Sequence, residues 1–80
     1  MATWTYEGYW NAVLGASRDA ANVVSEFELD ASDRRGIDEW LGVAEVDAWM
    51  AGGGEPHRDA LPTEWTEWHA KALNEIVAVA

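Results

Sequence analysis

The stretch LPTEWTEWHAKALNEIVAVA, residues 61–80, decides the fold, because its apolar residues recur at spacings of three and four. Such spacings place apolar side chains along one face of an α-helix. Pro62 suits a first helical turn, where its missing N–H costs no hydrogen bond. Glu67 and Lys71 form an i,i+4 pair in the favourable order. We therefore predict a helix over residues 62–79. Its apolar face comprises Leu61, Trp65, Trp68, Ala72, Leu73, Ile76 and Val79.

A second amphipathic pattern lies over residues 5–28, where tyrosine, tryptophan, valine and leucine side chains share a broad arc. Thr3 or Thr5 is suited to cap the start of this helix. The two glycines within it, one of them Gly15, each cost about 1 kcal/mol relative to alanine, so we expect fraying near the start. Glu28 would fall within the apolar arc, so the helix is predicted to end there.

Residues 33–51 carry a third helical pattern, with Asp30 or Ser32 as its predicted N-cap. Its apolar residues form two rows. Either the helix kinks near Gly42, with a short fourth helix beyond it, or it is one helix with two apolar faces. The second arrangement would leave a surface to bury against a partner. Three consecutive glycines, residues 52–54, end the helix because glycine loses the most entropy on ordering. The first row is Ile37, Trp40, Leu41, Ala44 and Ala48, and the second is Val43, Val46 and Met50.

The predicted fold is an all-α three-helix bundle, a single domain over residues 1–80. Eighty residues are near the lower size for one hydrophobic core, and six tryptophans supply much of the area that it can bury. The chain has no cysteine, which excludes disulfides and thiolate metal sites. It shows no signal-like start and no apolar run of roughly 20 residues. We therefore expect a cytoplasmic protein.

The charge balance is the strongest indication of function. Fifteen acidic residues face five basic ones, for a net charge of −10. Phosphate contacts need Lys and Arg, so this balance argues against direct binding of nucleic acid. It also argues against docking on anionic membranes. A basic protein surface is the natural complement. The alternatives are a face that is simply solvated and adaptation to high internal salt.

Residues suited to catalysis or metal binding are sparse. A metal site would need three or four ligands at helical or loop spacing, and the two histidines, His57 and His69, belong to no such set. We expect His69 to be a partly buried side chain with one hydrogen bond. The chain has neither a phosphate-binding glycine loop nor a nucleophile motif. We therefore predict a protein that is not an enzyme and uses no cofactor or metal.

Acids concentrate at the junction of the first two predicted helices and along the second. A row of carboxylates on a rigid helix can imitate the charge spacing of a phosphate backbone and occupy a basic groove. Trp49 lies outside both apolar rows, so it and Met50 are predicted apolar anchors at the interface. The predicted partner-binding residues are Glu26, Glu28, Asp30, Asp33, Asp38, Glu39, Glu45, Asp47, Trp49 and Met50.

In size, charge and lack of a catalytic signature, the chain is similar to small acidic inhibitors carried by phages and mobile elements. These include anti-CRISPR and anti-restriction proteins, some of which are nucleic-acid mimics. The resemblance covers composition alone and implies a protein-binding inhibitor of a nucleic-acid-binding complex. Two alternatives remain open. One is a structural or assembly protein that forms a homodimer through Val43, Val46, Trp49 and Met50. The other is a small immunity protein or antitoxin.

Overall fold

The protein is all-helical over the residues that the computed structural model describes, which are 4–15 and 18–80. Within these ranges there are four α-helices and one short 3₁₀ helix, and no strand. The all-α prediction is therefore confirmed, whereas the predicted number of three helices is not. In chain order, the elements are α1 (Tyr6–Leu14), α2 (Ala20–Glu26), α3 (Arg34–Ala51), η1 (Arg58–Ala60) and α4 (Glu64–Val77).

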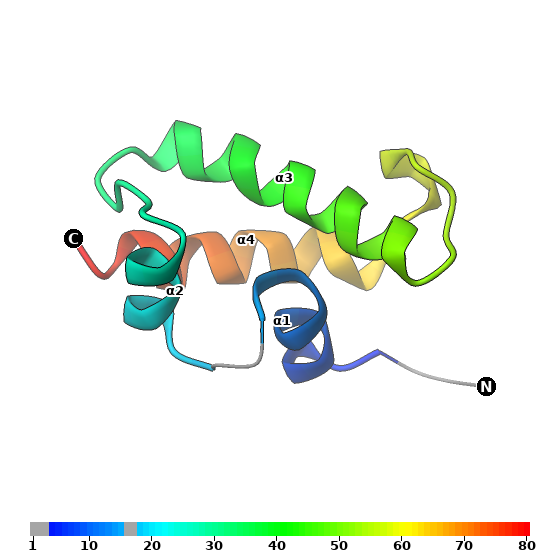
Figure 1. Ribbon diagram of the computed structural model, residues 1–80, viewed down its shortest axis with the longest axis horizontal. Helices are drawn as coiled ribbons and strands as arrows, with labels where there is room; N and C mark the ends of the chain where they lie inside the picture. Colours follow the sequence, from blue (N-terminus) through cyan, green and yellow to red (C-terminus); the bar gives the residue numbers. More distant parts are fainter. Residues whose placement is uncertain (1–3, 16–17) are drawn as a thin grey trace.

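The two long helices, α3 and α4, lie side by side in opposite directions, and the short helices α1 and α2 pack across them (Figure 1). Helix α1 contacts both long helices, and α2 contacts α4. The core fills the space between these elements and draws on all four α-helices. Its buried apolar residues are Tyr9, Trp10, Leu14, Val23, Ile37, Leu41, Trp65, Ala72, Leu73 and Ile76.

Helix α4 confirms the amphipathic pattern of the final stretch. Trp65, Leu73 and Ile76 are buried from its predicted apolar face. The regular helix begins at Glu64, two residues later than predicted. Before it, the Trp65 N–H donates to the Pro62 carbonyl at 3.0 Å in a tight turn. Acidic residues in the first turn complement the positive end of the helix dipole.

The predicted helix over residues 5–28 is divided into α1 and α2. Thr5 caps α1 as predicted, because its hydroxyl accepts from the Gly8 N–H at 3.0 Å. Helix α1 ends at Gly15, whose φ of 101° is strained for any residue with a side chain. Asp19 then caps α2 by accepting from the Ala21 N–H at 3.0 Å. Thr3, the other predicted cap, and residues 16 and 17 lie outside the described ranges.

Helix α2 ends at Glu26, two residues before the predicted end at Glu28, and Glu28 itself adopts a left-handed backbone with φ of 53°. The next N–H, from Leu29, donates to the Val24 carbonyl at 3.0 Å. This bond satisfies a carbonyl in the last turn of α2, as in a Schellman motif. Phe27, just before the turn, is left exposed on the surface.

Helix α3 is continuous over 18 residues, so no division into two helices occurs near Gly42. Its N-cap is Asp33, rather than the predicted Asp30 or Ser32, and the Asp33 carboxylate accepts from the Gly36 N–H at 3.0 Å. The kink predicted near Gly42 is not confirmed, and α3 carries apolar residues on two faces. One face packs in the core, and the other leaves Val43 62% exposed.

We expect Gly15→Ala to destabilise the protein by about 1–3 kcal/mol, because its backbone conformation is unfavourable for alanine. Gly52→Ala is the matched control, since Gly52 has an ordinary φ of −87° and an added Cβ would meet neighbours at 3.6 and 3.8 Å. This control should change the free energy of unfolding by less than about 1 kcal/mol. Urea denaturation measures both. Equal effects would contradict the assignment of Gly15 as the residue that ends α1.

Candidate functional site

Glu45 is a buried acid, only 1% exposed, on the inner face of α3. It lies in the stripe that also carries Ile37 and Leu41, one turn further along the helix. Glu45 belongs to the predicted partner-binding set, and the structure corrects this assignment. A carboxylate enclosed by the core cannot contact a partner, and it needs partners of its own within the fold.

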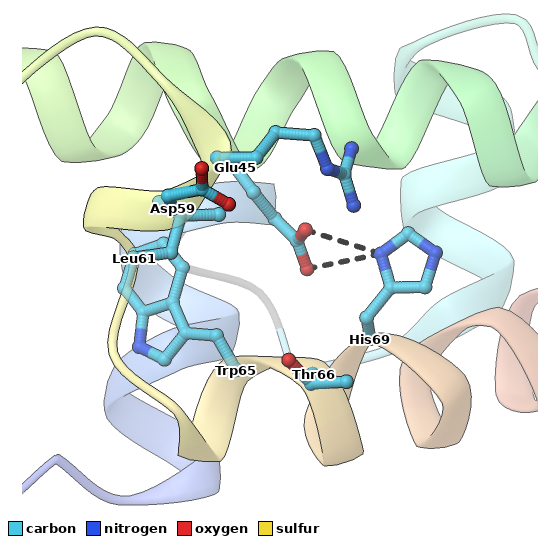
Figure 2. A pocket seen from close by; sticks show the side chains of 7 residues that line it. Glu45, Asp59, Leu61, Trp65, Thr66 and His69 are labelled. Carbon is cyan, nitrogen blue, oxygen red and sulfur yellow. Dashed lines mark hydrogen bonds and ion pairs between the residues drawn. The ribbon is translucent and has the colours of Figure 1, made fainter.

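Two neighbouring side chains supply the hydrogen bonds that Glu45 needs. The Tyr9 hydroxyl on α1 donates to Glu45 Oε2 at 2.5 Å. His69 Nδ1 on α4 lies 3.1 Å from both carboxylate oxygens of Glu45. Figure 2 shows the Glu45 carboxylate pointing from α3 toward the ring of His69, with both contacts drawn as dashed lines. Glu45 therefore links α3 to both α1 and α4.

His69 bridges two carboxylates, since its other ring nitrogen, Nε2, contacts Asp38. The prediction of one hydrogen bond for His69 is therefore wrong, because both of its ring nitrogens contact a carboxylate. Ionised carboxylates only accept hydrogen bonds, so a ring held between two of them is best satisfied as imidazolium, with both nitrogens donating. We call Tyr9, Asp38, Glu45 and His69 the carboxylate clasp.

The pKa values of His69, Asp38 and Tyr9 shift in the directions that this geometry dictates. The hydrogen bond to Glu45 is the main factor that raises the pKa of His69 above 6.5, and Asp38 adds to it, while burial opposes both. The hydrogen bond from His69 lowers the pKa of Asp38. Burial, followed by the bond to Glu45, raises the pKa of Tyr9 and keeps its hydroxyl protonated.

A pocket of about 270 Å³ opens beside the clasp, between α3, the η1 segment and the start of α4 (Figure 2). Arg58 and Asp59 line it together with Thr66. Neither ring nitrogen of His69 is available to take a proton from a molecule in this pocket, because each already faces a carboxylate. The arrangement is therefore better suited to holding helices together than to acid–base chemistry.

Among the described residues, no group of three or more His, Asp or Glu side chains is placed to hold a metal ion. Comparisons with protein-family models, with curated proteins and with solved structures found no match for this chain. Within the described part of the chain, no helix is long and apolar enough to cross a membrane. The site must therefore be interpreted from its own geometry.

The basic side chains are exposed, and most of them contact groups on other helices. Arg18 donates to Glu75 at 2.9 Å and lies over the ring of Trp10, 4.2 Å from its centroid. Arg34 donates to the Asn74 side chain at 2.8 Å, which ties the start of α3 to α4.

Two further cations are similarly placed. Lys71 lies over the Tyr6 ring, 4.4 Å from its centroid. The Arg58 guanidinium rests against Gly42, where any side chain would displace it. Arg58 therefore lies on the outer side of α3, where it offsets part of the acidic charge of Glu39 and Asp47.

The predicted partner-binding acids fall into three groups. Asp33 and Asp30 are exposed but serve local structure, since Asp33 caps α3 and Asp30 accepts from Ser32 at 2.6 Å. Asp38 and Glu45 belong to the clasp. The remaining acids are exposed and carry no cap or ring contact, although Arg35 lies 3.7 Å from Glu39. This third group comprises Glu26, Glu28, Glu39 and Asp47.

The two predicted apolar anchors have different surroundings. Met50 is 46% exposed on α3, as an anchor must be. Trp49 is half-buried, with its ring centroid 5.7 Å from that of Trp65 and 6.5 Å from that of Trp4. Its indole Nε1 is buried close to Gly54, with no hydrogen-bond partner among the described residues. Trp49 is therefore a partly buried residue that packs against the core, and its role as an anchor stays a prediction.

Phe27 is an exposed aromatic residue that the sequence analysis did not assign to the partner-binding face. It is 41% exposed and lies beside Trp40, with ring centroids 5.3 Å apart. On a wheel it belonged to the apolar arc of the first helix, so only the turn at Glu28 places it on the surface. Together with the exposed residues of α3 it makes an apolar surface rimmed by acids. We call Phe27, Glu39, Val43, Val46, Asp47 and Met50 the outer face.

We expect His69→Gln to remove a pH-dependent part of the stability. The pKa of His69 is raised in the folded state, so its contribution is complete below 6.5 and is lost as pH rises through the folded pKa. The pKa of Asp38 is lowered, so its contribution is lost as pH falls below 3.8. The stability difference between wild type and variant should therefore be largest between these two values. Urea denaturation across pH measures it, and a difference independent of pH would contradict the ionic clasp.

We expect Tyr9→Phe to destabilise the protein by about 1–3 kcal/mol, because it removes a hydrogen bond to a buried carboxylate. Tyr6→Phe is the matched control. Its hydroxyl donates to Glu75 at 2.6 Å, but Glu75 is partly exposed and also keeps its contact with Arg18. The control should cost less than about 1 kcal/mol. If thermal unfolding shows equal destabilisation by the two variants, the buried hydrogen bond to Glu45 stabilises the protein no more than the partly exposed one to Glu75.

Proposed function

We propose that this chain is a non-enzymatic, cytoplasmic inhibitor that binds a basic, nucleic-acid-binding site on a larger protein complex. The outer face of α3 and the neighbouring end of α2 would occupy that site in place of nucleic acid. The observation that carries the proposal is the arrangement of charges. Exposed acids lie along α3 and at the end of α2, while Arg18 and Arg34 donate to side chains of α4 and Lys71 lies over the Tyr6 ring.

The rigidity of α3 supports this role. Glu39 and Asp47 lie on one continuous helix, and their backbone positions are about 12 Å apart at the usual helical rise. Asp33 fixes the start of α3 as its N-cap, and the clasp holds its middle against α4. Carboxylates on a preorganised frame lose little freedom on binding, which favours association with a rigid basic groove.

This mode of action is that of the nucleic-acid mimics among anti-CRISPR and anti-restriction proteins, which the chain resembles in composition. Acids that mimic phosphates gain from the same lysine and arginine contacts that nucleic acid uses, and the association weakens as salt screens the charges. A small immunity protein or antitoxin would use the same charges against a basic toxin. It differs in the partner and not in the binding chemistry.

A structural dimer is the second candidate, and the exposure of Val43 and Met50 favours it. Trp49 is half-buried, and Val43, Val46 and Met50 lie on one side of α3. Two chains of net charge −10 repel each other, which opposes a small interface of this kind. Sedimentation measures this directly, because the dimer requires twice the monomer mass and the inhibitor does not.

The test of the proposal is a triple reversal, in which Glu26, Glu39 and Asp47 become lysine. These side chains are exposed and serve no cap or clasp, so the fold should survive. The tagged protein is used to capture partners from a lysate of the source organism at low and high salt. We expect wild type to capture a nucleic-acid-binding complex that salt or competing DNA or RNA releases. The triple variant should lose the complex.

In the matched control, three acids outside the outer face are replaced by lysine: Glu7, Glu55 and Glu64. Each reversal changes the net charge by two, so both variants move from −10 to −4. Circular dichroism verifies that both remain helical. If mimicry through the outer face is right, the control keeps the partner that the first variant loses. Equal retention by both variants would overturn the proposal, and equal loss would show that net charge alone acts.

A further inference from the structure

A hollow of about 380 Å³ lies on the surface between α1, the end of α2 and α3. Its volume falls within the roughly 300–1,000 Å³ of ligand pockets. Val13 of α1 lines it with Trp40 and Ala44 of α3, and Phe27 and Val43 flank them. With 41% of Phe27 and 62% of Val43 exposed, the hollow offers apolar area that the fold itself does not cover.

One charged side chain lines this hollow, the carboxylate of Asp47. Glu26 and Glu28 stand on either side of Phe27 in the chain, and both are exposed. The hollow therefore combines an apolar, aromatic interior with acids near its edges. A complementary segment must present an apolar side chain next to a lysine or arginine.

A second hollow, of about 430 Å³, lies on the other side of Val43 and is lined by Glu39 and Asp47 as well as by Arg58. The Arg58 guanidinium offsets part of the acidic charge there and would repel an incoming cation. Among the described residues, no basic side chain lines the hollow beside Phe27, so a basic segment meets no such repulsion there.

We propose that the hollow beside Phe27 is the docking site for an amphipathic basic helix of the partner. An aliphatic or aromatic side chain of that helix enters between Phe27 and Val43. A lysine or arginine one turn away pairs with Asp47. This is the helix-in-groove mode of recognition, in which apolar side chains supply affinity and flanking charges set orientation. The inference rests on the proposed function and names the element of the partner that the outer face receives.

Charge selects this occupant over a second copy of the chain. A copy would bring a net charge of −10 against the same acids. Its own exposed apolar residues on α3 are themselves flanked by Glu39 and Asp47. A basic amphipathic helix neutralises these carboxylates and covers the apolar surface at the same time.

The test uses three synthetic peptides and measures binding by fluorescence anisotropy. In the first, leucine recurs every three or four residues and lysine fills the other positions. The second replaces every lysine with glutamate, and the third keeps the lysines but replaces the leucines with alanine. We expect the first peptide to bind at least about tenfold more tightly than the third, and the second not to bind.

Exposed-site variants then locate the contact. Phe27→Ser and Val43→Ser should each weaken binding of the leucine–lysine peptide at least about fivefold, because each removes apolar contact without changing charge. Val79→Ser is the matched control, since Val79 is also exposed, at 40%, but lies beyond the end of α4. Val46→Ser tests the second hollow. Both of these variants should bind within about twofold of wild type.

The outcomes separate this inference from the proposed function. If the serine variants bind the peptide as tightly as Val79→Ser does, the apolar hollow is not the docking site and the inference is overturned. The captured complex can still depend on the reversed acids, in which case the proposed function stands alone. A dimer seen in sedimentation and abolished by Phe27→Ser and Val43→Ser would assign the hollow to a second copy. That result also overturns the inference.

Discussion

The contact of Glu45 with His69 is the interaction on which the rest of the structure depends. Glu45 is only 1% exposed, and burying a carboxylate is costly unless hydrogen-bond donors and a neighbouring positive charge compensate for the lost water. Tyr9 on α1 and His69 on α4 supply these contacts, so three helices are fixed around one buried carboxyl group. Losing one partner would leave charge in the core, which makes this register of α3 against α4 hard to shift.

The contacts of Glu45 and Asp38 within the fold determine which charged side chains remain on the surface of α3. Because Glu45 and Asp38 face His69, one side of α3 is committed to the fold. The opposite side carries Val43 and Asp47, which have no such task. Cations such as Arg18 and Arg34 are engaged with α4. The resulting surface is acidic and partly apolar, which is the property that the proposed binding to a basic helix requires.

Local chemistry in the sequence was enough to predict much of the fold. Helix α4 follows from its apolar spacing, the Thr5 cap from its hydroxyl, and the approximate end of α2 from Glu28. The break at Gly15 was not predicted. A glycine in a sequence lowers helix stability, but the sequence does not show whether that glycine adopts a positive φ and ends the helix. Glu45 was misplaced because acids are usually exposed. Its position in an apolar stripe, with a histidine at the edge of another stripe, was the signal that could have identified the clasp. Trp49 is more buried, and Phe27 more exposed, than the helical pattern of each predicts. The reason is that burial depends on how helices pack together, which the periodicity within one helix does not specify.

Hydrogen exchange of the captured complex, compared with the protein alone, tests the central claim most directly. The account predicts that binding slows exchange at backbone amides near the outer face, from Glu39 to Met50, and around Phe27. Amides in the middle of α4 should change little, because the clasp already holds that helix against α3. Protection confined to α4 or to the pocket beside His69, with α3 unchanged, would contradict the claim that the outer face receives the partner.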